Sequence, residues 1–170
     1  VALPLNVGML LFYHIFLHVY NSGIRFASIW NAKARLWVEG RKNIFERLKA
    51  ALEKGEGPII WMHSSSLGEF EQGKPVLESL KTTYPGHRIL LTFFSPSGYE
   101  IRKNYDGADM VFCLPLDGRI RSRKFLDIIH PELAIFIKYE SWFYYLNGLK
   151  KRRIPPITSQ IPPNTVYVLE

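Results

Sequence analysis

The sequence predicts an α/β fold, with a Rossmann-like parallel sheet and flanking helices. Two observations carry this prediction: four short runs are almost continuously apolar, and a segment with helical spacing separates each run from the next. Strands buried on both faces read as continuous apolar runs, whereas half-exposed strands alternate. Parallel strands need crossover connections, which are almost always right-handed. The four expected strands are 59–63, 88–94, 109–114 and 132–138.

Five helices are expected around these strands, at 44–52, 69–83, 99–105, 119–130 and 141–152. Asn43 and Glu46 have the spacing of a capping box, which predicts the start of the first helix. Tyr84-Pro85-Gly86 ends the second. Together with the strands, these helices predict one Rossmann-like domain over 58–154. Four prolines follow Arg153, so residues 155–170 are expected to form an irregular tail rather than a fifth strand.

Residues 1–31 differ from the rest of the chain, because Arg25 is the only charged residue between Val7 and Trp30. As a helix this stretch would be about 36 Å long, enough to cross a hydrocarbon layer. One apolar helix face is expected from Leu10, Leu11, Phe12, Ile15, Phe16 and Val19. The pattern predicts a membrane-associated helix that either spans the bilayer or lies in its interface. A helix packed on the core of the domain is the alternative.

The chain is basic, with a formal charge of +7 and a pI of about 9.5. Residues 32–57 are expected to form a basic linker and a short helix, and basic residues after a membrane segment mark its cytoplasmic side. Such a charge favours binding to polyanions, which include nucleic acid, an acidic membrane face and phosphorylated substrates. Nucleic acid is not expected, because basic and aromatic residues do not interleave on a strand face. The apolar fraction of 47% excludes a disordered chain, and the single cysteine excludes an internal disulfide.

Several short motifs point to other chemistries and are rejected. The run from Ser64 to Gly68 resembles a nucleophile elbow that lacks its first glycine. Cys113 and Arg119 have the spacing of a phosphatase loop, but a proline and an aspartate lie between them and suit a phosphate cradle poorly. Neither nucleotide-binding glycine fingerprint is present. The histidines show no metal-binding pattern apart from a pair four residues apart in the first segment, so no metal or cofactor is expected.

Residues 58–69 carry the main functional hypothesis, because an apolar run ends abruptly in polar residues and Glu69 follows. In α/β proteins, ligands bind at the carboxyl ends of strands. Glu69 is therefore a candidate catalytic base. On spacing alone, a carboxylate favoured by the helix dipole is the simpler explanation. The neighbouring residues favour the catalytic interpretation, because serine hydroxyls can orient a sugar or a phosphate and a glycine lets a substrate approach the backbone. These residues are Ser64, Ser65, Ser66 and Gly68.

Four further motifs join this stretch to form a recognisable set. They are Thr92-Phe93-Phe94-Ser95-Pro96-Ser97-Gly98, Leu114-Pro115-Leu116-Asp117, Lys138-Tyr139-Glu140-Ser141-Trp142 and the membrane-like N-terminus. With 61–69, they resemble the N-terminal domain of the 3-deoxy-D-manno-octulosonic acid (Kdo) transferases of lipopolysaccharide assembly, in a Bacteroidetes-like form. The resemblance covers about residues 8–155.

The resemblance implies the N-terminal half of a GT-B glycosyltransferase, which transfers Kdo from CMP-Kdo to a lipid A precursor with inversion. It implies that Glu69 is the general base and that no metal takes part. The implied acceptor-binding residues are Ser64, Ser65, Ser66, Gly68, Ser95, Ser97, Gly98 and Glu140. Arg41 and Lys42 are the candidate phosphate or headgroup contacts. The implied location is the cytoplasmic face of the bacterial inner membrane.

The chain departs from that family in length, because its members are more than twice as long and carry a second domain for CMP-Kdo. That donor domain is absent here, so we expect a truncated copy or a separate half that is inactive alone. A second hypothesis from another class remains open: a non-catalytic membrane-surface module that binds anionic lipid through its basic face.

Overall fold

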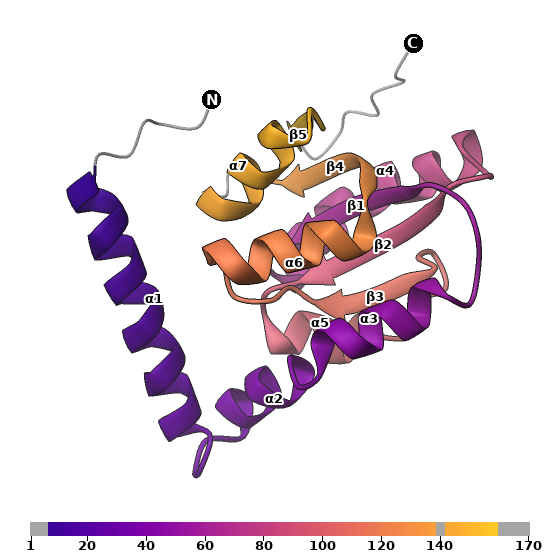
Figure 1. Ribbon diagram of the computed structural model, residues 1–170. Coiled ribbons are helices and arrows are strands. Elements are labelled where there is room, and N and C mark those ends of the chain that lie inside the picture. The colour runs from indigo at the N-terminus through magenta and orange to yellow at the C-terminus, as the bar shows by residue number, and fades with distance from the viewer. Residues whose placement is uncertain (1–6, 139–141, 160–170) are drawn as a thin grey trace.

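The computed structural model describes residues 7–138 and 142–159, and it contains the expected parallel sheet. The five strands lie in the order β3-β2-β1-β4-β5, and all neighbours pair in parallel. The strands are β1 (Ile59–Ser64), β2 (Arg88–Phe93), β3 (Met110–Cys113), β4 (Pro131–Ile137) and β5 (Pro156–Ser159). The α/β architecture is thus confirmed (Figure 1).

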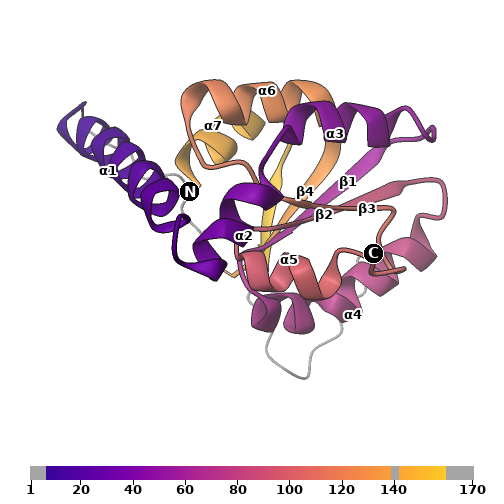
Figure 2. The same ribbon diagram turned by 90° about the horizontal axis from the view of Figure 1, so that it is seen from below.

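Helices cover both faces of the sheet. The helices are α1 (Val7–Ala27), α2 (Ala32–Gly40), α3 (Ile44–Leu52), α4 (Leu67–Thr83), α5 (Pro96–Arg102), α6 (Arg119–Ile129) and α7 (Phe143–Lys151). Figure 2 shows α3, α6 and α7 on one side of the sheet and α4 and α5 on the other. Two separate cores result, because successive side chains of each strand point to opposite faces.

Trp61 and Met62 show this alternation in β1. Trp61 is fully buried against α6 and α7, and its indole N–H donates to Thr92 Oγ1 at 2.9 Å. Met62 points the other way, toward α4. Helix α4 approaches it closely at Gly73, where an added Cβ would lie 2.5 Å from Met62 Cε and 2.7 Å from Ile137. Gly73 therefore sets the distance between α4 and the sheet.

The strand order creates a switch point beside β1. β1 pairs with β2 on one side and with β4 on the other, so the chain leaves β1 in opposite directions in the two halves of the sheet. The connections after β1 and β4 therefore part at the carboxyl edge and leave a crevice there. This edge is where the sequence places its candidate residues.

The tail prediction was wrong for residues 156–159, which form β5. This strand pairs with β4 through Ala134↔Pro156 and Ile135↔Ile157. A proline that opens an edge strand leaves the ladder intact, because its missing N–H falls at the strand's first residue. The rest of the predicted tail, 160–170, lies outside the described residues.

The helix starts also differ from the expectation. α4 begins at Leu67 rather than at 69, and α5 covers 96–102 rather than 99–105, with Pro96 in its first turn. The capping box predicted at Asn43 was wrong, because that residue is left-handed (φ 49°) and makes no side-chain cap. A side chain reaches the first-turn N–H groups only from extended backbone, and a left-handed residue points it elsewhere.

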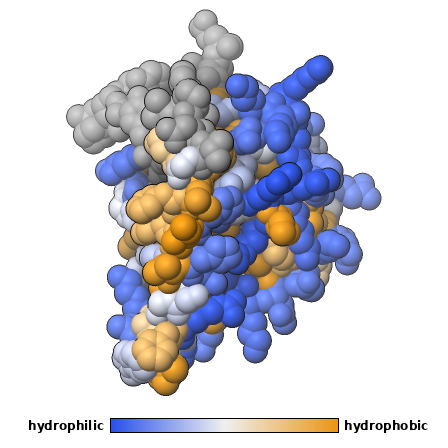
Figure 3. Space-filling model, turned by 60° about the vertical axis from the view of Figure 1, so that its left-hand side comes forward, coloured by the Kyte–Doolittle hydropathy of each residue, from blue (hydrophilic) through white to orange (hydrophobic). Residues whose placement is uncertain are grey.

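Helix α1 lies at one edge of the domain (Figure 1), where one of its sides packs on the domain and the other is exposed. Leu17 is buried with Trp37 and Leu116. The exposed side chains include Met9, Leu11, Phe12, Ile15, Phe16, Val19 and Phe26. Figure 3 shows hydrophobic side chains gathered in a band beside a hydrophilic surface. Among the described helices, none has the length and apolarity that a membrane crossing requires.

Candidate active site

The β1–α4 junction brings Glu69 and the serines together by helix capping. β1 ends at Ser64, and Ser66 is the N-cap of α4. Ser66 Oγ accepts from the Glu69 N–H at 3.3 Å, while Glu69 Oε2 accepts from the Ser65 N–H at 2.7 Å. This pair of reciprocal bonds resembles a capping box, which needs Ser and Glu three residues apart. The capping signal in this chain therefore lies at 66–69 and not at Asn43.

Glu69 lies at the carboxyl end of β1, as the sequence predicts, and it is half-buried. Its carboxylate is in the first turn of α4, where the helix dipole stabilises negative charge. Oε2 is engaged by Ser65, but no described residue donates a hydrogen bond to Oε1 or forms an ion pair with the group. Oε1 therefore retains the capacity to accept a proton from an incoming hydroxyl.

A buried histidine, which the sequence reasoning did not single out, supports the same loop. His63 Nδ1 lies 3.1 Å from the Thr92 carbonyl oxygen, and its Nε2 lies 3.3 Å from Ser65 Oγ. With the proton on Nδ1, His63 donates to the Thr92 carbonyl, and Nε2 then accepts from the Ser65 hydroxyl. Ser65 is thus held by His63 through its side chain while its N–H holds Glu69. The available signal was a histidine on an otherwise apolar strand.

The β2–α5 loop lies beside this junction. The Ser95 N–H donates to the Ser65 carbonyl at 2.8 Å, and the hydroxyls of Ser95 and Ser97 are 2.8 Å apart on the surface. The structure therefore brings Ser65 and Ser66 together with Ser95 and Ser97. Ser64 differs from them, because its side chain is fully buried and Oγ has no hydrogen-bond partner among the described residues.

The two candidate glycines serve different purposes. Gly98 is buried, and a Cβ there would lie 2.8 Å from the Phe93 ring and 3.2 Å from the Leu67 nitrogen. It thus lets α5 pack against the start of α4. Gly68 faces open space, with nothing within 4 Å of an added Cβ. Of the two, only Gly68 leaves the backbone open to a substrate.

The predicted phosphate contacts lie in unlike surroundings. Arg41 donates to the carbonyls of Leu114 at 2.9 Å and Phe94 at 2.7 Å, and its guanidinium stacks on Trp37. Burial lowers the pKa of Arg41 to about 10. These bonds fasten the loops after β2 and β3, which favours a structural role over a phosphate contact. Lys42 is exposed. Glu140 lies outside the described residues.

Asp117, from one of the sequence motifs, joins three elements at the carboxyl edge. It is fully buried, and Oδ2 accepts from the Tyr13 hydroxyl at 2.7 Å and from the Tyr144 N–H at 3.1 Å. Burial raises the pKa of Asp117, although both hydrogen bonds oppose the shift. Burial and the neighbouring carboxylate also raise the pKa of Tyr13. Asp117 therefore fastens α1 and α7 to the edge of the sheet.

An apolar cavity of about 360 Å³ lies between α1 and this edge. Helix α1 forms one wall through Tyr13, Phe16, Leu17 and Tyr20. The opposite wall is made by Phe94, Leu116 and Trp142. Phe94 precedes Ser95 in sequence, and the Trp142 ring contacts the His63 ring. Ser95 and His63 both contact Ser65, whose N–H holds Glu69. Two residues of the cavity wall are thus linked to the residues that hold Glu69.

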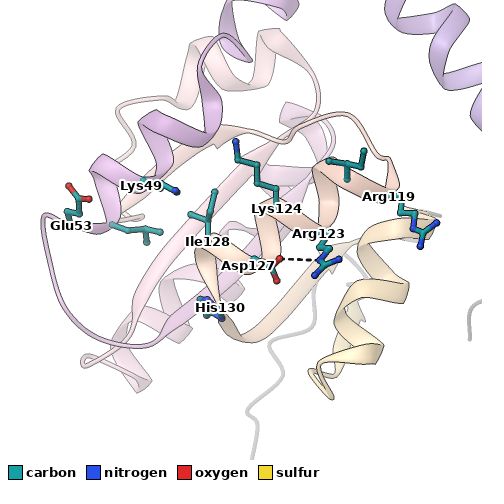
Figure 4. A pocket seen from close by; sticks show the side chains of 10 residues that line it. Lys49, Glu53, Arg119, Arg123, Lys124, Asp127, Ile128 and His130 are labelled. Carbon is teal, nitrogen blue, oxygen red and sulfur yellow. Dashed lines mark ion pairs between the residues drawn. The ribbon is translucent and has the colours of Figure 1, made fainter.

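A larger groove of about 710 Å³ lies between α3 and α6, away from the junction after β1. Its cationic lining is Lys49, Arg119, Arg123 and Lys124 (Figure 4). Arg123 pairs with Asp127 at 3.5 Å, so part of this charge is neutralised. The helix expected at 119–130 supplies Arg119, Arg123 and Lys124 to this lining. Within residues 7–138 and 142–159, no cluster of three or more acidic, histidine or cysteine side chains is placed to hold a metal ion.

Comparison with known proteins agrees with the motifs. The sequence model of the 3-deoxy-D-manno-octulosonic-acid transferase (kdotransferase) family matches residues 42–159. The 3-deoxy-D-manno-octulosonic acid transferase of Aquifex aeolicus is 36% identical over 95 residues, which are 55% of this chain and 26% of that protein. The Chlamydia muridarum enzyme is 35% identical over 101 residues, covering 58% and 23%.

A third relative, the Haemophilus influenzae 3-deoxy-D-manno-octulosonic acid transferase, is 30% identical over 97 residues, covering 56% of this chain and 23% of its own length. The chain spans about a quarter of the length of the curated relatives it matches. The family match covers well over half of the chain and takes in β1, α4 and Glu69. The chain therefore belongs to the 3-deoxy-D-manno-octulosonic-acid transferase family of glycosyltransferases.

Proposed function

We propose that this chain is the acceptor-binding half of an inverting glycosyltransferase that transfers Kdo from CMP-Kdo to a lipid A precursor in lipopolysaccharide biosynthesis. The observation that carries the proposal is Glu69: a half-buried carboxylate at the carboxyl end of β1, held by the Ser65 N–H at 2.7 Å. Family membership supports the reaction class. A further domain supplies the CMP-Kdo site.

Glu69 acts as the general base in this proposal. Its Oε1 takes the proton of the acceptor's primary hydroxyl while that oxygen bonds to the anomeric carbon of Kdo. The bond from that carbon to the CMP oxygen breaks, and CMP leaves with the electron pair. One carboxylate suffices and no metal is required, because CMP is already a good leaving group. General-base help of this kind is worth roughly 10²–10⁴-fold in rate.

The residues around Glu69 orient the acceptor. Ser97 is exposed and Ser95 is partly buried, and their hydroxyls suit sugar hydroxyls. Gly68 leaves the backbone open to a close approach. In this proposal Glu140 is a second acceptor contact, and Lys42 is a phosphate contact. The Ser65 bond prevents the carboxylate from turning away from the incoming hydroxyl.

We further propose that the enzyme works on the cytoplasmic face of the inner membrane, with the exposed apolar side of α1 lying in the lipid interface. The exposed side chains of α1 and the basic charge of the chain support this, because apolar burial and attraction to anionic lipids add. The same observation favours the second candidate, a non-catalytic module that binds anionic lipid.

Glu69→Gln tests the catalytic proposal in an enzyme that carries this chain together with a donor-binding domain. Gln keeps an oxygen that accepts from the Ser65 N–H but cannot take up the proton, so we expect kcat to fall roughly 10²–10⁴-fold with little change in Tm. The substrates are lipid A precursor and CMP-Kdo.

The matched control is Glu71→Gln, two residues along α4. Glu71 is exposed and pairs with Arg102 at 2.6 Å, so its variant should keep wild-type kcat. Transfer at the wild-type rate by both Glu69→Gln and Glu69→Ala would refute the base assignment. It would leave the non-catalytic lipid-binding module as the better function.

A further inference from the structure

We propose that the cavity between α1 and the carboxyl edge of the sheet binds one acyl chain of the acceptor. The inference rests on the proposed function, because it takes the acceptor to be a lipid. The cavity's volume of about 360 Å³ lies within the range of small-molecule sites. Its walls are aromatic and leucine side chains, and the Tyr13 hydroxyl is already donated to Asp117. Such walls select an apolar occupant.

Two residues of the cavity wall, Phe94 and Trp142, connect it to the residues that hold Glu69. Phe94 forms one wall, and the N–H of the next residue, Ser95, donates to the Ser65 carbonyl. Trp142 forms another part of the wall, and its ring lies 5.5 Å from the ring of His63. Since Ser65 holds Glu69, an acyl chain in the cavity lies next to the residues that orient the base. The acyl chain and the reacting hydroxyl belong to the same acceptor molecule, so binding of the acyl chain positions the hydroxyl.

The cavity also opens toward the exposed face of α1. Phe16 lines the cavity while 53% of its surface remains exposed, and its neighbours along the helix, Phe12 and Val19, are exposed as well. An alkyl chain that leaves the cavity therefore passes onto an apolar surface. A compact ligand needs no such continuation, whereas an acyl chain whose remainder lies in lipid does.

The wall formed by α1 is fixed by contacts within the protein. The Tyr13 hydroxyl donates to Asp117, and Tyr144 bonds to His14 one residue further along α1. Leu17 is buried with Trp37 and Leu116. The cavity is therefore preformed, and the ordering of α1 does not have to be supplied by the ligand.

The test is binding of bromine-labelled lauric acid, below its micelle concentration, to the 170-residue chain. Bromine quenches nearby tryptophan fluorescence, and Trp142 lines the cavity, so we expect saturable quenching that Trp142→Phe reduces. Phe16→Ala removes cavity lining and should weaken binding about tenfold. Leu17→Phe fills the cavity and should abolish saturable quenching.

Ile15→Ala is the matched control, because Ile15 is also 53% exposed and adjacent on α1 but does not line the cavity. It should bind lauric acid like the wild type. Equal weakening by Ile15→Ala and Phe16→Ala would overturn the proposal, since the ligand would then adsorb on the outside of α1. Undiminished quenching in folded Leu17→Phe would overturn it too. No transfer is measured, so this result is independent of the Glu69 experiment.

Discussion

At the β1–α4 junction, single residues combine a structural and a proposed catalytic role. Ser66 caps α4 while Glu69 bonds back to Ser65, so the carboxylate is oriented by the bonds that start the helix. Such a carboxylate loses little orientational freedom when a substrate arrives. Asp117, at the same edge of the sheet, has a structural role alone, and its burial is offset by bonds that fasten α1 and α7 to that edge.

Asp117 should make folding stability depend on pH. Its folded-state pKa is raised above the ordinary value of 3.8 by burial, so the folded state holds this proton more tightly than the unfolded state. The contribution of Asp117 is therefore fully present below the unfolded pKa and is lost as pH rises through the folded pKa. Urea unfolding of the wild type and Asp117→Asn at about pH 4 and about pH 7 measures this difference.

We expect the wild type to lose stability relative to Asp117→Asn as the pH rises. Asn does not titrate, and its oxygen still accepts from Tyr13. Subtracting the variant removes the opposite contribution of Asp127, whose pKa is lowered first of all by its hydrogen bond from Arg152. A stability difference that is constant with pH, or that grows in favour of the wild type, would contradict the assignment.

At the scale of the elements, α4 packs closely on the sheet at one glycine and leaves its backbone accessible at another. Its Gly73 lies against Met62 and Ile137, whereas Gly68 at its start faces open space. Helix α1 shows a similar division, because its inner side packs on Leu116 and its outer side is exposed. In both helices, one side packs on the domain and positions the site. The other side is open to an incoming ligand or surface.

The two glycines of α4 should respond differently to alanine. Gly73→Ala places a Cβ into Met62 and Ile137, so we expect a loss of roughly 1–3 kcal/mol in the free energy of unfolding, measured in urea. Gly68→Ala meets no atom and should leave stability unchanged. With a donor-binding domain present, Gly68→Ala should raise KM for the acceptor. An unchanged KM would mean that the substrate does not approach the backbone at this turn.

At the scale of the whole molecule, the switch point and α1 both lie at the carboxyl edge of the sheet. The connections after β1 and β4 leave this edge in opposite directions, and Tyr13 of α1 bonds to Asp117 in the loop after β3. The exposed apolar side of α1 and the candidate active site thus belong to the same end of the molecule. A lipid-linked acceptor held at a membrane surface would meet both together.

Binding to anionic vesicles should depend on charge and on α1. The chain carries a formal charge of +7, so binding to phosphatidylglycerol-containing vesicles should exceed binding to phosphatidylcholine and fall between about 0.1 and 1 M salt. Phe12→Ser should weaken binding. Ile101→Ser is the control, because Ile101 is also an exposed apolar side chain (58%, against 73% for Phe12) but lies on α5. Equal effects of both variants in a vesicle co-sedimentation assay would exclude α1 as the contact.

Much of the fold and part of the site were predictable from local patterns. Apolar runs identified β1 to β4, and the position of Glu69 after β1 followed from where strands end in an α/β sheet. β5 was missed because proline lowers strand propensity, and only pairing with β4 makes an edge strand of it. The support of His63 was missed because its partner Thr92 lies on the next strand.

The sequence by itself determined β1 to β4, the alternation of strands and helices, the net charge and the family, because periodicity, composition and motifs are local properties of the chain. Only the tertiary structure decided which polar groups are engaged. It joined Tyr13 to Asp117 across 104 positions, assigned Arg41 to backbone carbonyls and formed the cavity between α1 and the carboxyl edge of the sheet. The physical reason is that a buried polar group must find a partner in space, and the chain order does not specify which one it meets.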